Sequence, residues 1–174
     1  GIDTFIFDWY WYDDGPFLER GLDEGFLNAP NNDRMKFSLM WANHDWIDIH
    51  PMKACDNALE NAKLLYPGAV TPETFEKIMD VCIERYFKHP SYWLIDGCPY
   101  YSIYELTKLI GGFGGVEKTR ELLDLFRQKV KAAGFKDLHL NAIVWNNPIL
   151  PGETAPTDAK MLVDALGFDS VNSY

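Results

Sequence analysis

Aromatic residues, mostly beside carboxylates or amides, stand at the ends of five short apolar runs, a pattern that could bind a sugar. These run ends hold Asp8, Trp9, Tyr10, Trp11 and Tyr12; Trp41, Asn43, His44, Asp45 and Trp46; Tyr104 and Glu105; Trp145, Asn146 and Asn147; and Asn172, Ser173 and Tyr174. Apolar faces of sugar rings stack on Trp and Tyr, while amides and carboxylates bind hydroxyl groups. Any one of these residues could equally be a core aromatic or a turn former. Their repetition favours a carbohydrate site.

The carboxylates among them could supply acid–base chemistry. Hydrolysis of a glycosidic bond normally uses two carboxyl groups, one protonated and one ionised. We predict catalytic roles for Glu105 and Asp45. Glu105 could instead simply begin a helix, because it opens a Glu-Leu-Thr-Lys stretch.

The other run-end residues are predicted to bind substrate. Trp41 is expected to be a sugar platform and Asn43 a partner for a sugar hydroxyl. The full predicted binding set is Asp8, Trp9, Tyr10, Trp11, Trp41, Asn43, His44, Trp46, Tyr104, Trp145 and Asn146.

Other kinds of site are disfavoured. His44, Asp45, Asp48 and His50 resemble a metal-binding loop, but such a group is more often a plain polar loop, so we predict no metal and no cofactor. The glycine-rich run at 111–115 is predicted to be a flexible loop before a helix. It does not directly follow a strand and lacks a Walker lysine, which argues against a nucleotide. A Gly-x-Ser-x-Gly elbow is also absent from the sequence.

Net charge and the lengths of the apolar runs limit the classes of binding partner that the chain is expected to have. The 174 residues carry a net charge of −10, which is the wrong sign for binding nucleic acid through its phosphates. No apolar run approaches the roughly 18–20 residues of a membrane span. A carbohydrate is therefore the expected partner. The three cysteines form no metal or disulfide framework and leave the compartment undecided.

The elements that must position these residues alternate between strands and helices. The apolar runs at 4–10, 36–41, 99–104, 138–145 and 168–172 are predicted to be strands of a parallel sheet, buried on both faces. Helices are predicted from a Thr71 cap to about His89, from Val116 to Gly134, and from a Thr157 cap to Gly167.

Three of the four intervals between strand starts match the roughly 30 residues per unit of a (β/α)8 barrel of about 250 residues, and the interval from 36 to 99 carries an extra segment. We predict an α/β fold of the TIM-barrel type, with residues 1–174 forming one five-stranded portion of the barrel. Its strands should be adjacent in sequence order, with helices on the outer face only. A long loop is expected at about 44–70. The chain starts with Gly1 rather than Met, so the gene product is expected to begin upstream.

Several motifs resemble the WbsX-like group related to glycoside hydrolase family 99. They lie at 7–12, 37–46, 86–93, 95–99 and 115–120, and include Trp-Ala-Asn at 41–43 and His-Pro-Ser-Tyr-Trp at 89–93. The resemblance implies a (β/α)8 barrel that acts on glycans, with this chain spanning about the second to sixth strands.

The resemblance implies hydrolysis of α-linked, mannoside-type polysaccharide, with glycosyl transfer in surface polysaccharide assembly or non-catalytic glycan binding as alternatives. His44 and Asp45 replace the Glu-Asn pair of the family pattern, so only a general polar role carries over. The family's late Glu-Trp-x-Glu motif is not found in these residues. Its catalytic pair is therefore expected downstream, with this segment supplying substrate binding.

Overall fold

The computed structural model describes residues 1–48, 62–144 and 158–173. Its strands and helices, in chain order, are β1 (Thr4–Tyr12), β2 (Gly15–Phe17), η1 (Gly21–Phe26), η2 (Asn32–Arg34), β3 (Lys36–Trp41), β4 (Trp46–Ile47), β5 (Leu64–Tyr66), α1 (Pro72–Val81), η3 (Cys82–Phe87), β6 (Leu94–Ile95), β7 (Cys98–Ile103), α2 (Leu106–Phe113), α3 (Val116–Ala132), β8 (His139–Ile143), α4 (Ala159–Leu166) and β9 (Ser170–Asn172).

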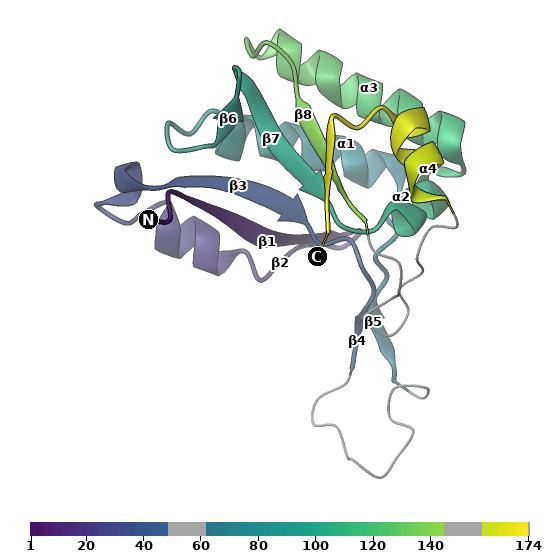
Figure 1. The fold of residues 1–174 in the computed structure, drawn as a ribbon. Helices are drawn as coiled ribbons and strands as arrows, with labels where there is room; N and C mark the ends of the chain where they lie inside the picture. Colours follow the sequence, from purple (N-terminus) through teal and green to yellow (C-terminus); the bar gives the residue numbers. More distant parts are fainter. Residues whose placement is uncertain (49–61, 145–157, 174) are drawn as a thin grey trace.

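A mostly parallel sheet forms the centre of the fold (Figure 1). The strands β1, β3, β7, β8 and β9 are hydrogen-bonded neighbours in that order, and each adjacent pair is parallel. The short strands β2 and β6 add antiparallel pairs to β1 and β7. The predicted α/β class and strand order are therefore confirmed. Closure of the sheet into a barrel stays a prediction.

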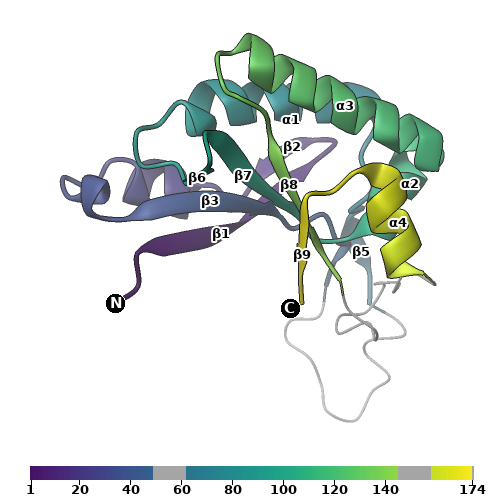
Figure 2. The same cartoon turned by 45° about the horizontal axis from the view of Figure 1, so that its top comes forward.

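The helices cover one face of this sheet. In Figure 2, α1 and α3 lie together on one side of the strands. One apolar core joins them to the sheet, through Phe75 of α1, Phe126 of α3 and Leu166 of α4. Leu22 of η1 belongs to the same core. We call the opposite face of the sheet, which these helices do not cover, the inner face.

The helix boundaries follow the local chemistry of the sequence. Thr71 caps α1 by accepting a hydrogen bond from the Thr74 backbone nitrogen at 3.2 Å, with Pro72 in the first turn. Gly167 ends α4 in the left-handed conformation that glycine adopts without strain. Asp158, rather than the predicted Thr157, caps α4 within the described residues.

The glycine run at 111–115 is partly helical, so its interpretation as a loop was wrong. Gly111 and Gly112 lie inside α2, and Gly114 ends that helix with a φ of 84°. A methyl group at Gly112 would overlap the carbonyl oxygen of Val70. The glycine there permits a close approach between α2 and the segment that precedes α1.

An insertion follows β3. Its two strands β4 and β5 pair antiparallel and extend away from the sheet in Figure 1. They fall within the long loop predicted at about 44–70.

Candidate functional site

Alternation along the strands decides which side chains reach the inner face. On β3, Phe37, Leu39 and Trp41 belong to the core under the helices. Met40 lies on the opposite face, in a small cluster with Tyr104 and with Tyr10 packed against it. Because successive strand residues point to opposite faces, β1 presents Asp8 and Tyr10 on the inner face.

Two of the predicted sugar-binding tryptophans are core residues. Trp41 is 0% exposed and stacks on Phe75, with ring centroids 5.5 Å apart. Trp9 is 2% exposed and donates from its indole nitrogen to the Tyr86 hydroxyl at 3.3 Å. Neither ring has a free face for a sugar, so the platform assigned to Trp41 was wrong. Trp11 also lies on the helix side, against Trp9.

Aromatic rings gather around His44 just beyond the end of β3. Tyr10 and Tyr104 meet the imidazole edge-on, at centroid distances of 5.8 and 5.6 Å. Trp46 stacks on it at 6.1 Å and also contacts Tyr10 at 5.5 Å. We call Tyr10, His44, Trp46 and Tyr104 the His44 cluster. All four belong to the predicted binding set; Tyr104 and His44 are only 4% and 8% exposed, so Tyr10 and Trp46 offer the accessible ring surface.

Asp8 adds a carboxyl group beside this cluster. It is solvent-accessible and pairs in register with Met40 across β1 and β3. Desolvation by its neighbours raises the pKa of the Asp8 carboxyl above 3.8, and the positive charge of protonated His44 partly opposes that rise. Asp8 and His44 are thus close enough for their charges to interact.

Asp45 is engaged by the protein itself. One carboxylate oxygen accepts from the Gly68 backbone nitrogen at 2.8 Å, and the other accepts from Lys108 Nζ at 2.7 Å. These bonds connect the end of β3, the return of the insertion and α2. Such an arrangement favours a positioning role for Asp45 over the predicted catalytic role.

Asn43 and Glu105 connect the ends of β3 and β7. The Asn43 amide donates to the Glu105 carbonyl oxygen and accepts from the Glu105 nitrogen, both at 2.8 Å. Asn43 is 0% exposed, so the predicted contact with a sugar hydroxyl was wrong. Glu105 is also buried and directly precedes α2, and its Oε1 accepts from the Thr107 hydroxyl at 2.9 Å. A catalytic role for Glu105 stays a prediction.

A polar network on β7, β8 and β9 was missed by sequence reasoning. Asn141 donates from Nδ2 to Ser102 Oγ at 2.9 Å and to Asn172 Oδ1 at 2.6 Å, and accepts from Ser170 Oγ at 2.9 Å. His139 Nε2 lies 2.8 Å from Ser170 Oγ. The available signal was small polar residues at every second position within apolar strands, where burial on both faces had been predicted.

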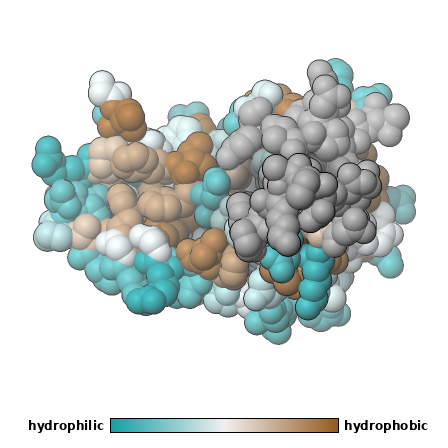
Figure 3. Space-filling model, turned by 90° about the horizontal axis from the view of Figure 1, so that it is seen from below, coloured by the Kyte–Doolittle hydropathy of each residue, from teal (hydrophilic) through white to brown (hydrophobic). Residues whose placement is uncertain are grey.

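Figure 3 shows an apolar surface near the start of β1. Hydrophobic side chains gather there over the half of the molecule where β1 begins. Ile2, Phe5 and Ile6 are among the exposed large hydrophobic residues. Since β2 pairs with β1 only from Tyr10 to Tyr12, the first half of β1 has a free edge among the described residues.

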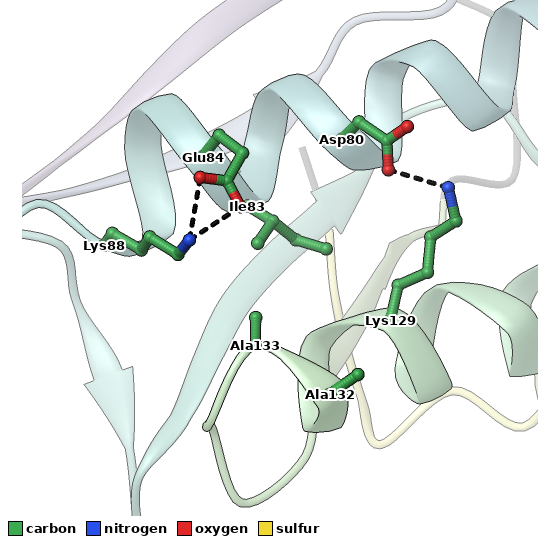
Figure 4. A pocket seen from close by; sticks show the side chains of 7 residues that line it. All are labelled: Asp80, Ile83, Glu84, Lys88, Lys129, Ala132 and Ala133. Atoms are coloured by element: carbon green, nitrogen blue, oxygen red, sulfur yellow. Dashed lines mark hydrogen bonds and ion pairs between the residues drawn. The ribbon is translucent and has the colours of Figure 1, made fainter.

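Two clefts lie on the helix side, away from the His44 cluster. Figure 4 shows the first, between α1–η3 and the end of α3. Its four charged side chains pair with one another: Lys88 with Glu84 at 2.6 Å and Lys129 with Asp80 at 2.7 Å. Trp11 lines the second cleft, with Arg85 and Tyr86 among its neighbours. Exposed ion pairs of this kind contribute little free energy.

The remaining predicted site residues lie outside the described part of the chain. These are Trp145 and Asn146, together with Asn147 and with His50 of the possible metal group. Among the residues that the structure describes, no group of three or more His, Cys, Asp or Glu side chains is arranged to hold a metal ion.

Comparison with known protein families tests the family resemblance that the sequence motifs suggest. The family model described as glycosyltransferase WbsX matches residues 1–170. The chain belongs to this family. Membership in the WbsX family makes it part of a glycan-related group, consistent with the expected carbohydrate partner. No curated protein and no solved structure matches the chain.

Within residues 1–48, 62–144 and 158–173, no helix combines the length and apolar character that a bilayer crossing requires.

Proposed function

We propose that this chain forms the sugar-binding face of a glycan-active enzyme, with the His44 cluster at its centre. The observation that carries the proposal is the set of aromatic rings at the carboxyl ends of adjacent parallel strands, with Asp8 beside them. In α/β folds with parallel strands, ligands bind at this edge of the sheet. Tyr10 and Trp46 are only partly buried, which leaves ring surface available to a sugar.

Binding is tested by removing a ring of the cluster. Trp46→Ala is expected to weaken binding of α-linked mannose oligosaccharides about tenfold, because an aromatic contact is worth about 0.5–1.5 kcal/mol beyond its buried area. Trp93→Ala is the matched control: Trp93 is also partly buried, but its backbone pairs with Phe37 at the opposite end of the sheet. Isothermal titration calorimetry measures both. Equal losses in the two variants would contradict the proposal.

The finer proposal is hydrolysis of an α-linked, mannoside-type polysaccharide. Within it, Glu105 keeps its predicted catalytic role and Asp8 is proposed to bind hydroxyls or steady a developing positive charge, because the family's principal carboxylate pair belongs to a motif that these residues do not contain. Their separate environments support this division, since Glu105 is buried and Asp8 is accessible. Glu105→Gln should lower turnover without loss of folding, whereas Glu117→Gln, on the exposed first turn of α3, should leave it unchanged.

Glycosyl transfer is the second candidate, and the description of the matching family favours it. The two reactions are separated by their products. Hydrolysis adds water and creates a new reducing end, while transfer lengthens an acceptor glycan. Mass spectrometry of an α-linked mannotriose incubated with the protein distinguishes these outcomes. Binding without either product would support the non-catalytic alternative.

A further inference from the structure

We propose that His44 is the proton-exchanging group of this face, accepting a proton at Nε2 from a sugar hydroxyl while Asp8 supplies the balancing negative charge. This inference rests on the proposed function, because it assigns a chemical task within the sugar-binding cluster. It goes beyond binding by naming the atom that takes the proton.

The hydrogen bond of His44 fixes its tautomer. Its Nδ1 lies 2.9 Å from the carbonyl oxygen of Asp45. A carbonyl oxygen only accepts hydrogen bonds, so Nδ1 must carry the proton. In the neutral ring Nε2 then bears the free lone pair, and this is the nitrogen that can take up a proton.

The other two described histidines carry their proton on Nε2 rather than on Nδ1. Ser170 Oγ donates to Asn141 Oδ1, so it must accept from His139, whose Nε2 therefore carries a proton. His89 Nδ1 accepts from the Ser91 backbone nitrogen at 3.1 Å, which leaves its proton on Nε2. Among the three histidines in the described ranges, His44 alone is held with a basic Nε2.

Contacts with the backbone of His44 also hold this residue in place, in addition to the aromatic side chains that pack on its ring. The Tyr12 hydroxyl donates to the His44 carbonyl oxygen at 3.3 Å, and burial raises the pKa of Tyr12, which keeps that hydroxyl a donor. Gly68 packs so tightly on Asn43 and His44 that a methyl group there would overlap their backbone. The residue that fixes the tautomer, Asp45, is itself anchored by its side chain.

Two carboxyl groups among the described residues lie near the His44 ring, those of Asp8 and Asp45. Asp8 is the carboxyl group whose titration responds to His44. Asp45 is the other nearby carboxylate, and Lys108 already neutralises it in an ion pair of 2.7 Å. Among the described residues, Tyr10 and Tyr104 are the other titratable groups that pack on the ring. Of the carboxylates in that part of the chain, Asp8 is the one we assign to balance a positive imidazolium.

The proposed step is a proton transfer in which atoms and charge balance. The O–H bond of a bound sugar hydroxyl breaks, its electron pair stays on oxygen, and the proton forms an N–H bond at Nε2 of His44. The positive charge of the resulting imidazolium interacts with the Asp8 carboxylate. The oxygen gains nucleophilic character, and the reverse transfer returns the proton.

Nitrogen NMR of the histidine-labelled chain tests the tautomer directly. Long-range proton–nitrogen spectra at alkaline pH distinguish a protonated ring nitrogen from an unprotonated one, and His→Gln variants assign each ring. We expect the Nδ1–H form for His44 and the Nε2–H form for both His139 and His89. An Nε2–H form at His44 would overturn the proposal.

Two further measurements test the electrostatic interaction between His44 and Asp8 and the contact of His44 Nε2 with a bound sugar. His44→Gln should raise the pKa of Asp8, followed by carboxyl carbon NMR, whereas His89→Gln should leave it unchanged; an unaltered Asp8 titration in His44→Gln would overturn the pairing. Adding α-linked mannotriose should move the Nε2 resonance of His44 and not that of His139. If the sugar binds while His44 Nε2 is unmoved, the proton-exchanging role is wrong. If no sugar binds, the proposed function fails, while the tautomer measurement still decides which nitrogen is basic.

Discussion

Asn43 offers a sharp test of how the ends of β3 and β7 are held together. Its side chain is fully buried and exchanges two hydrogen bonds of 2.8 Å with the backbone of Glu105. Asn43→Ala would leave the nitrogen and the carbonyl oxygen of Glu105 without these partners. The carbonyl oxygen still accepts from the Leu109 nitrogen at 3.2 Å, so the lost bond to the buried nitrogen sets the cost, about 1–3 kcal/mol.

A loss of about 2 kcal/mol, the middle of this range, lowers Tm by about 4–8 °C in a chain of this size. Differential scanning calorimetry and urea unfolding measure the effect. Asn43→Asp keeps the shape but places an acceptor against the Glu105 carbonyl oxygen, so it should be similarly destabilising at neutral pH.

Asn31→Ala is the control, because Asn31 is exposed and its side chain does not cap η2. It should change the free energy of unfolding by less than about 0.5 kcal/mol. If Asn43→Ala were equally mild, the two strand ends would not depend on this amide, and the reasoning would be refuted.

Three other expectations concern the core, the charge state and the glycine run. Trp41→Ala should cost about 3–5 kcal/mol in urea unfolding, while Trp41→Phe should leave glycan affinity unchanged, since the ring lies under the helices; a selective loss of affinity would contradict this. Burial lowers the pKa of His89 below 6.5, so its stabilisation is present above that pH and lost as pH falls through the lowered value; His89→Gln should flatten the dependence of unfolding free energy between pH 7 and 5, and an unchanged slope would count against it. Gly112→Ala should lower Tm because its methyl group meets Val70, whereas Gly111→Ala, with open space around it, should raise stability by up to about 1 kcal/mol; the reverse order would refute the packing argument.

The order of the strands was predictable because their signals are local. Apolar runs, the Thr71–Pro72 helix start and the glycine at 134 each act within a few residues of chain. A parallel sheet then requires a connecting segment between neighbouring strands, so the spacing of the runs indicated their adjacency.

The direction of each aromatic side chain was not predictable from the same signals. The run at 36–41 is apolar at Phe37, Leu39, Met40 and Trp41, and so lacks the alternation that would mark its two faces. A shift of one residue moves a side chain to the opposite face. For this reason Trp41 was assigned to the sugar site, although it lies in the helix-covered core.

The His44 cluster was only partly visible in the sequence. Its members were in the predicted binding set, but they come from β1, β4 and the ends of β3 and β7. The hydrogen bond that fixes the tautomer of His44 depends on the path of the chain at Asp45. Such geometry is set by tertiary packing and has no sequence signature.

The glycan-binding face is tested most directly by the indole N–H resonances of the chain labelled with nitrogen-15 at tryptophan. On addition of α-linked mannotriose, the account predicts that the Trp46 resonance moves in a saturable way, while those of Trp9 and Trp41 stay fixed because both rings are buried under the helices. Saturable movement of the Trp9 or Trp41 resonance with Trp46 unaffected would contradict the placement of the sugar on the inner face.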